Sequence, residues 1–287
     1  MVKKLLVLVL GLIFLAPFTA VAASSPYKAV YGHGPEKFTL ATGSPGELGL
    51  LKALAEGFDK SMQGKITLQW IKAGSGKSLQ LLKDKKVDMI MVHAPAAEKK
   101  AVAEGWAIDR TLIGSNEFYI VGPVSDPAKI AQATSAADAY KHIAQAKAKF
   151  FSRGDNSGTN KKELFIWKEA GIKPSGPWYI VTKDFMIATL KRANQGKGYF
   201  MVDSSTWVAE KKHMPNLKVL YKGDKVLINT YHALCQPKGA TPGATIAAKF
   251  IAYVASLAGQ KIIQDYGKDR YGEALYNDAV YARQYAD

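Results

Sequence analysis

Residues 38–58, FTLATGSPGELGLLKALAEGF, decide the fold expected for this chain. The stretch 38–41 has the apolar and β-branched residues of a short strand, and residues 42–46 have the composition of a tight turn. Apolar residues then recur at helical spacing from Leu48 to Phe58. The sequence therefore predicts a strand that ends in a hydroxyl-bearing turn and leads directly into a helix.

The same order of elements recurs along the chain. Strands are expected at 66–71, 87–92, 118–121, 149–152, 178–181, 199–202 and 225–237, and helices at 77–85, 96–105, 127–133, 136–146, 160–170, 184–194, 243–257 and 259–266. Strands that alternate with helices form mainly parallel sheets, and ligands bind beyond the carboxyl ends of such strands. The side chains of Thr42, Ser44 and Ser75 would project there.

The order of elements also indicates two lobes. The strand at 118–121 is closed by a Gly-Pro pair and leads away from the first unit, and the strand at 225–237 returns to it. We expect an α/β protein in which residues 36–121 and 232–287 form one lobe and residues 122–231 the other. The two hinge strands would leave a cleft between the lobes, with turns from each lobe facing it.

The first residues have the pattern of a secretory signal. Lys3 and Lys4 precede an apolar run at 5–18, and Ala20-Val21-Ala22 is typical of a signal-peptidase site. Pro17 interrupts a run that is already shorter than the roughly 20 residues of a membrane-spanning helix. We therefore expect residues 1–22 to be removed and the mature protein to be a soluble monomer in the periplasm.

Charge and cysteine content narrow the function classes. The formal net charge is +15, which favours anionic partners. Nucleic acid is not an expected partner, because the lysines are dispersed and form no compact stripe with interleaved aromatic residues. Cys235 is the only cysteine, so a disulfide within the chain is excluded and a buried structural thiol is expected.

Four turns rich in hydroxyl groups and glycine are the candidate binding elements. They are residues 42–44, 74–76, 153–159 and 203–206. Where such a turn opens a helix, unpaired N–H groups and the positive end of the helix dipole attract an anion. Plain helix capping explains any single turn equally well, but the predicted topology directs several of them at one crevice.

Arg153 adds the one specific charge to these turns. Its planar fork suits two oxygens of an oxyanion, and it stays ionised at any relevant pH. The alternative is a surface ion pair with Asp155 or Glu163.

Catalytic, metal and nucleotide motifs are weak. Gly76-Lys77-Ser78 resembles the end of a P-loop, but Ile71 stands where that motif needs glycine. The five histidines show no metal-ligand spacing, so neither a metal nor a cofactor is expected. An enzyme on the same scaffold, with His93, Asp155 or Asp203 as acid or base, is the rival to a binding protein.

The order of elements from about residue 38 to 266 resembles the periplasmic tungstate-binding proteins of ABC importers. The most specific stretches are 116–123 (NEFYIVGP) and 152–159 (SRGDNSGT). The resemblance implies a two-lobed, type II-like periplasmic binding protein fold that delivers a tetrahedral oxyanion to a membrane permease.

The resemblance also implies a set of ligand contacts. Arg153 would be the main positive contact, and the helix start that follows it would donate from Ser157 and Thr159. Thr42, Ser44 and Ser75 would serve from the first lobe. The first turn departs from the family, because Ala-Thr-Gly-Ser-Pro-Gly-Glu replaces a run of threonines followed by serine.

The chemistry of the candidate groups favours tungstate or molybdate. Both are unprotonated dianions near neutral pH and need only donors, whereas hydrogen phosphate carries a proton that needs an acceptor. An inward-pointing Asp155 would favour a protonated ligand instead. A small organic carboxylate or another anion is the alternative, motivated by the altered turn at 42–47.

Overall fold

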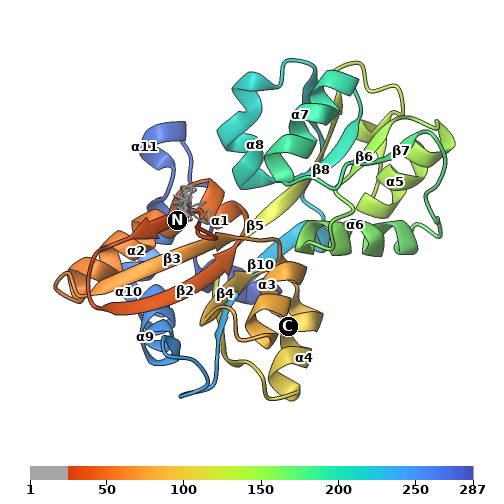
Figure 1. Cartoon of the computed structure of the whole chain (residues 1–287). Coiled ribbons are helices and arrows are strands. Elements are labelled where there is room, and N and C mark those ends of the chain that lie inside the picture. Colours follow the sequence, from red (N-terminus) through yellow and green to blue (C-terminus); the bar gives the residue numbers. More distant parts are fainter. Residues whose placement is uncertain (1–24, 287) are drawn as a thin grey trace, which may run out of the picture.

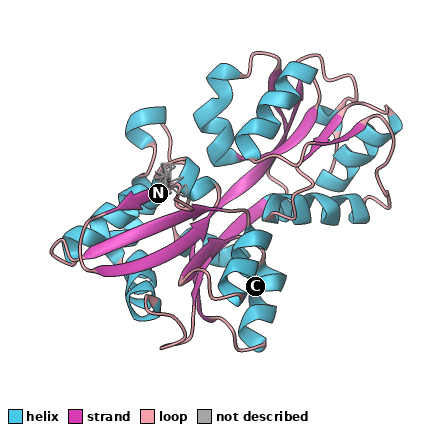
Figure 2. Cartoon of the chain, viewed as in Figure 1, coloured by secondary structure: helices cyan, strands magenta, loops and turns pink. Residues whose placement is uncertain are grey.

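A computed structural model describes residues 25–286, so the predicted signal peptide at 1–22 lies outside the described residues. The chain folds into two lobes, each a sheet flanked by helices, and the predicted two-lobed α/β fold is confirmed (Figures 1 and 2). Within residues 25–286 no single helix is long and apolar enough to cross a membrane. One bent helix pair meets that test by length and composition, Ala244–Ala255 with Leu257–Tyr271.

The first lobe is built around a twisted sheet with strand order β1-β3-β2-β4-β10-β5. Strands β2, β3 and β4 are mutually parallel, and β10 runs antiparallel to β4 and β5. The bounds are β1 Ala29–Tyr31, β2 Glu36–Thr42, β3 Ile66–Lys72, β4 Met89–Val92, β5 Ile108–Pro123 and β10 Ile228–Cys235. The helices of this lobe are α1 Ser44–Glu47, α2 Leu50–Ser61, α3 Ser75–Lys83, α4 Pro95–Ala103, α9 Ala244–Ala255, α10 Leu257–Asp265, α11 Lys268–Tyr271 and α12 Ala279–Ala282.

The second lobe continues the path of strands as β5-β8-β6-β7, with β9 also pairing with β5. Its strands are β6 Phe150–Ser152, β7 Tyr179–Val181, β8 Tyr199–Asp203 and β9 Leu217–Tyr221. Its helices are α5 Ala136–Gln145, α6 Gly158–Glu169, α7 Met186–Gly196 and α8 Ser204–Glu210. Strands β6, β7 and β8 are parallel, so their carboxyl ends share one edge, which faces the first lobe (Figure 1).

Strand β5 joins the lobes and is much longer than the stretch expected at 118–121. Its first half pairs with β10 and its second half with β8 and β9. Residues 108–117 have no apolar alternation because this half of the strand carries buried polar groups, including Ser115 and Asn116, which are fully buried or nearly so. The antiparallel β5–β10 pair is the connection between the lobes.

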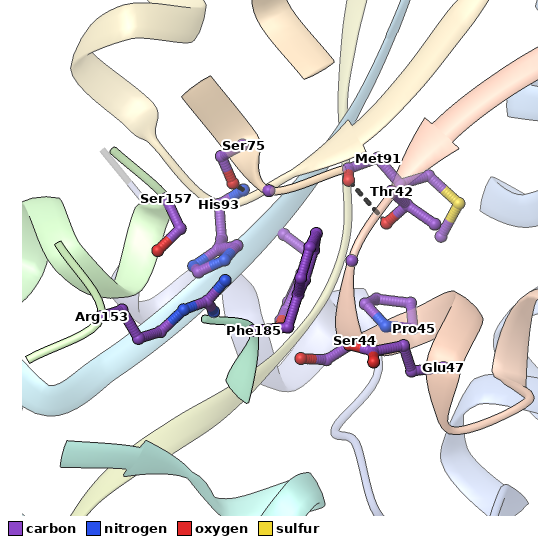
Figure 3. Close-up of a pocket in the computed structure, with 13 residues that line it drawn as sticks. Thr42, Ser44, Pro45, Glu47, Ser75, Met91, His93, Arg153, Ser157 and Phe185 are labelled. Carbon is purple, nitrogen blue, oxygen red and sulfur yellow. Dashed lines mark hydrogen bonds between the residues drawn. The ribbon is translucent and has the colours of Figure 1, made fainter. Parts of the chain in front are cut away.

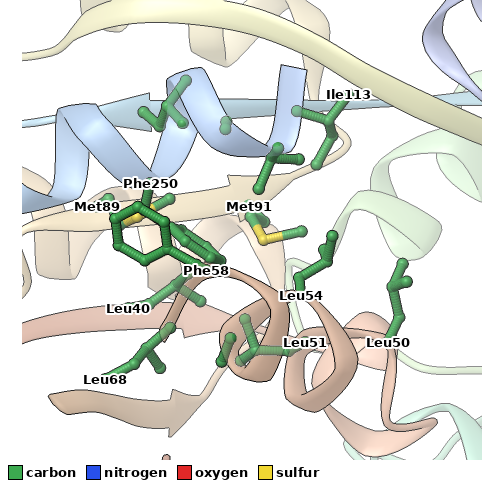
Figure 4. Close-up of a cluster of buried hydrophobic side chains, with 14 of the residues drawn as sticks. Leu40, Leu50, Leu51, Leu54, Phe58, Leu68, Met89, Met91, Ile113 and Phe250 are labelled. Atoms are coloured by element: carbon green, nitrogen blue, oxygen red, sulfur yellow. The ribbon is translucent and has the colours of Figure 1, made fainter. Parts of the chain in front are cut away.

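Each lobe has its own hydrophobic core. In the first lobe Phe38, Phe58 and Phe250 form an aromatic cluster in which Phe250 lies 5.4 Å from Phe38 and 5.2 Å from Phe58, ring centre to ring centre. Figure 4 shows Phe58 and Phe250 among the other core side chains. The three rings come from β2, α2 and α9, so elements from the early and the late part of the sequence pack together in one lobe. In the second lobe Trp167 packs on Tyr140 at 4.4 Å, ring centre to ring centre. Such rings contribute large buried areas and stabilise the core of each lobe.

Candidate functional site

A small cavity lies between the lobes, at the ends of the strands and the starts of the helices (Figure 3). The first lobe contributes its turn after β2, the start of α3 and the residue after β4, and the second lobe contributes the starts of α6 and α7. The lining residues are Thr42, Gly43, Ser44, Pro45, Glu47, Gly74, Ser75, Met91, His93, Arg153, Ser157, Phe185 and Tyr231. The structure therefore brings five of the six predicted site residues to one cavity, three from the first lobe and two from the second.

The loop from Arg153 to Ser157 turns β6 into α6. Gly154 and Asn156 both have left-handed backbone angles, with φ of 58° and 57°. A side chain at Gly154 would also collide with Val181, so glycine is required there on both counts. Ser157 caps the helix, because its Oγ accepts a hydrogen bond from the Asn160 N–H at 3.2 Å. The loop thereby holds Arg153 beside the positive end of α6.

Arg153 is a buried cation with an unused donor. Only 4% of its surface is exposed, and its Nη2 pairs with Asp155 Oδ2 at 2.6 Å. Its Nε is buried and has no hydrogen-bond partner. The predicted alternative of an ion pair with Asp155 is thus also present, but the pair lies inside the cleft. A buried donor without a partner is costly, and an anion oxygen in the cavity would satisfy it.

Asp155 does not act as a free acceptor in the cavity. Its Oδ2 accepts from Arg153, and its Oδ1 accepts from the Ser157 N–H at 3.2 Å. Donors of its own loop therefore occupy both oxygens.

Thr159 is the predicted site residue that the structure leaves out of the cavity lining. It lies in the first turn of α6, 1% exposed, and its Oγ1 is buried with no hydrogen-bond partner. Together with Arg153 Nε, this hydroxyl makes the start of α6 a place where two buried polar atoms are unsatisfied. Buried polar atoms of this kind often indicate a missing ligand or water.

The hydroxyl groups of the first lobe differ in whether they already donate a hydrogen bond within the protein. Thr42 Oγ1 donates to the Met91 carbonyl at 2.8 Å, and Ser44 Oγ donates to Asp203 Oδ2 at 3.3 Å. Ser75 Oγ instead accepts from the His93 N–H at 3.2 Å. Because a hydroxyl has one proton to donate, Ser75 keeps its proton for a ligand, as Ser157 does, whereas Thr42 and Ser44 use theirs within the protein.

His93 belongs to a buried polar chain that the sequence analysis did not find. Its Nδ1 lies 2.8 Å from Asn229 Oδ1, and Asn229 Nδ2 donates to Asn116 Oδ1 at 2.7 Å. The Asn229 oxygen is therefore the acceptor and His93 Nδ1 carries the proton. Burial lowers the pKa of His93 to about 4, so the ring is neutral at pH 7. The available signal in the sequence was a pair of asparagines in the two otherwise strand-like hinge segments.

Asp203 anchors the other end of this polar chain. The carboxylate is 1% exposed and accepts from Ser205 Oγ, Thr206 Oγ1 and the Thr206 N–H at 2.7–2.8 Å. Asn116 and Ser44 add longer bonds of 3.4 and 3.3 Å. With its oxygens filled in this way, Asp203 is a fixed structural acceptor and a poor base toward a ligand.

The cleft is closed in this structure, and glycines allow the two lobes to approach each other closely. We call Gly74, Gly76 and Gly158 the glycine seam. A Cβ atom at Gly74 would lie 3.0 Å from Ser157 Cβ, one at Gly76 would overlap the backbone oxygen of Asn156, and one at Gly158 would lie 2.5 Å from the His93 ring. Each of these contacts joins one lobe to the other.

Metal binding by the protein itself finds no support in residues 25–286. No group of three or more His, Cys, Asp and Glu side chains there could hold a metal ion.

Glu163 is a buried carboxyl group directly behind the Arg153 loop. Only 2% of it is exposed, and it accepts hydrogen bonds from Ser152 Oγ and Tyr179 OH, both at 2.7 Å, and from Trp167 Nε1 at 3.3 Å. Burial raises the pKa of Glu163 to about 7. The carboxyl group positions the end of β6, from which Arg153 projects.

The raised pKa of Glu163 predicts a pH-dependent stability. Since the folded chain holds the Glu163 proton more tightly than the unfolded chain, its stabilising contribution is full below about pH 4 and is lost as the pH rises to 7. Relative to Glu163→Gln, we expect the free energy of unfolding of the wild-type protein to fall by roughly 2–3 kcal/mol between pH 5 and pH 8. Urea denaturation of both proteins at the two pH values measures this, and an equal difference at both would contradict it.

The sequence and the fold are both similar to those of known solute-binding proteins. A family model described as the PBP superfamily domain matches residues 29–257. The tungstate-binding protein TupA of Peptoclostridium acidaminophilum is 35% identical over 241 residues, which cover 82% of each chain. The solved structure of the tungstate ABC transporter protein of Geobacter sulfurreducens is 37% identical with a TM-score of 0.73, covering 82% of this chain and all of the other. The tungstate-binding protein TupA of Desulfovibrio alaskensis is also 37% identical, with a TM-score of 0.69 over 84% of this chain and 98% of its own.

Proposed function

The chain belongs to the PBP superfamily and, within it, to the family of the TupA tungstate-binding proteins, and from this premise we propose that it binds tungstate or molybdate. It would serve as the extracytoplasmic binding component of an ABC importer and hold the oxyanion in the cavity between its lobes. The two TupA relatives are binding proteins by name, and the proposed role involves no catalysis.

The unsatisfied Arg153 Nε is the observation that carries this proposal. It is a buried, permanently charged donor at the cavity between the lobes, and the Ser75 and Ser157 hydroxyl protons are the other free donors there. An unprotonated tetrahedral dianion offers oxygens to all three. A ligand that carries its own proton needs an acceptor, but the oxygens of Asp155 and Asp203 already accept hydrogen bonds, and Glu47, the carboxylate that lines the cavity, is paired with Lys72.

The proposed mechanism is closure of two lobes on the ligand. We propose lobes formed by residues 36–121 with 232–287 and by residues 122–231, moving about β5 and β10. The ligand would contact Ser75 in one lobe and Arg153 in the other, so binding shifts the population toward the closed form. The closed form would then dock on a permease in the membrane.

Calorimetry against a panel of anions tests the proposal. We expect heat of binding with tungstate and molybdate, and much weaker or no binding with phosphate and sulfate. Ligand at a thousand times its Kd should add about 4 kcal/mol to the free energy of unfolding and raise the melting temperature accordingly. No heat and an unchanged melting curve with both metal oxyanions would overturn this choice of ligand.

A different small anion, including an organic carboxylate, is the second candidate. The observation in its favour is that the Thr42 and Ser44 hydroxyl protons are donated within the protein, so the altered first turn offers fewer side-chain donors to a four-oxygen ligand. A carboxylate panel in the same calorimetric experiment separates the two candidates.

The proposed site of action is the periplasm, reached through a signal peptide at residues 1–22. We propose that the mature protein acts there as a monomer. Nucleic acid is not a proposed partner.

A further inference from the structure

Phe185 occupies a position between the lobes that the anion site alone does not explain. Its half-buried ring lines the cavity from the second lobe (Figure 3). Lys72 Nζ, at the end of β3 in the first lobe, lies 4.2 Å from the ring centre, and the Arg153 guanidinium carbon lies 5.7 Å from it. One aromatic ring thus interacts with a cation from each lobe, at distances typical of cation–π contacts.

Lys72 is held in place for this contact. Its Nζ forms an ion pair with Glu47 of the same lobe, and Glu47 lines the cavity while Lys72 does not. The paired Glu47 offsets the lysine charge, which makes Lys72 a poor ligand contact. The ion pair fixes the ammonium group over the Phe185 ring.

Local structure gives no reason for a phenylalanine at this position. Phe185 is the N-cap residue of α7, where Ser, Thr, Asp or Asn would accept a hydrogen bond, and it makes no side-chain capping bond. A residue that breaks a local rule is often kept for a functional reason. Here the aromatic face supplies what a capping side chain cannot, an attraction for the cations on both sides of the cleft.

We propose that Phe185 is the gate of the cavity, latched by Lys72 when the lobes close. The inference rests on the proposed anion-binding function and adds to it the residues that control ligand release. Lys72 and Phe185 belong to different lobes, so their contact breaks on opening. Losing it should speed release of the ligand, without removing any group that donates to the anion.

Rates of tungstate release test the gate. We expect Phe185→Leu to speed dissociation roughly threefold to thirtyfold, the range given by one cation–π contact. Glu47→Gln/Lys72→Met, compared with Glu47→Gln, should do the same without leaving an unpaired Glu47 carboxylate beside the anion. Phe185→Tyr keeps the aromatic face and should release at nearly the wild-type rate. Adding Phe185→Leu to Glu47→Gln/Lys72→Met should speed release further only by the share of the Arg153 contact, so the two effects should not multiply. Phe165→Leu, an exposed phenylalanine on α6 of the same lobe, is the matched control.

A ligand-free readout keeps this test separate from the choice of anion. Relative to their parent proteins, amide hydrogen exchange in the segments 42–47 and 153–160 should quicken in Phe185→Leu and in Glu47→Gln/Lys72→Met, because the closed form is less populated. Failure of the wild-type protein to bind tungstate would count against the proposed function. The hydrogen-exchange comparison needs no ligand, so it would still test the gate. If the Phe185 and Lys72 variants both released tungstate and exchanged their amide hydrogens at the rates of their parent proteins, the proposed gate would be wrong.

Discussion

Arg153→Ala is expected to weaken tungstate binding at least about thirtyfold, because truncating one partner of a buried charged contact costs about 2–5 kcal/mol. The wild-type guanidinium is 4% exposed and keeps an unpaired Nε at the cavity. A ligand oxygen would meet that donor only in the closed form. Calorimetry with tungstate on the wild-type and variant proteins measures the loss.

The same variant should leave the ligand-free melting temperature nearly unchanged. In the absence of ligand the arginine pairs with Asp155 and lies over the Phe185 ring, but it also leaves one buried donor unsatisfied, so its removal has opposing effects on stability. Arg192→Ala is the matched control, since it removes an exposed arginine paired with Asp184 in the same lobe. Unchanged affinity in Arg153→Ala, or an equal loss in Arg192→Ala, would show that Arg153 has no specific role.

The fold was predictable because hydrophobic spacing and turn chemistry agree along most of the chain. The stretch that begins at Phe38 has the expected strand and helix, β2 at Glu36–Thr42 and α2 at Leu50–Ser61, but part of the expected turn forms the short helix α1 at Ser44–Glu47. Strand β5 was predicted only in part. Its first half carries buried Ser115 and Asn116, and a buried polar strand has no apolar periodicity to reveal it.

The sequence predicted which residues lie at the candidate site better than it predicted what each of them does there. Turn composition pointed to Thr42, Ser75 and Arg153, and the structure brings all three to one cavity. Which way a hydroxyl donates depends on its neighbours in space. Thr42 faces the Met91 carbonyl, and this contact comes from a strand 49 residues away in the sequence.

The gate and the hinge network were missed for the same reason. Phe185 and Lys72 are 113 residues apart, and nothing in either local sequence relates one to the other. His93, Asn229 and Asn116 form a chain only because β5 and β10 pair in the hinge. Interactions of this kind are set by topology and register, which sequence periodicity leaves open.

Gly158→Ala is expected to weaken tungstate binding roughly tenfold to a hundredfold through a wholly different cause, a clash that exists only in the closed form. Gly158 is the first residue of α6, and its φ is not in the left-handed region. Alanine is therefore compatible with the helix and should stabilise it by up to about 1 kcal/mol. In the closed cleft, however, its Cβ would lie 2.5 Å from the His93 ring and 2.6 Å from the His93 carbonyl oxygen.

The contact with the His93 carbonyl oxygen decides how much Gly158→Ala weakens binding. A ring can rotate away, but the His93 carbonyl is backbone that hydrogen bonds and packing around it hold in place, so the lobes must separate to admit the methyl group. Ligand contacts that need both lobes are then lost together, and small-angle scattering with saturating tungstate should show a larger radius of gyration than in the wild-type protein. Leu164→Ala, an exposed change on the same helix, is the control. A Gly158→Ala protein that binds and compacts like the wild type would mean that the ligand is held without full closure, and the glycine seam would then serve packing alone.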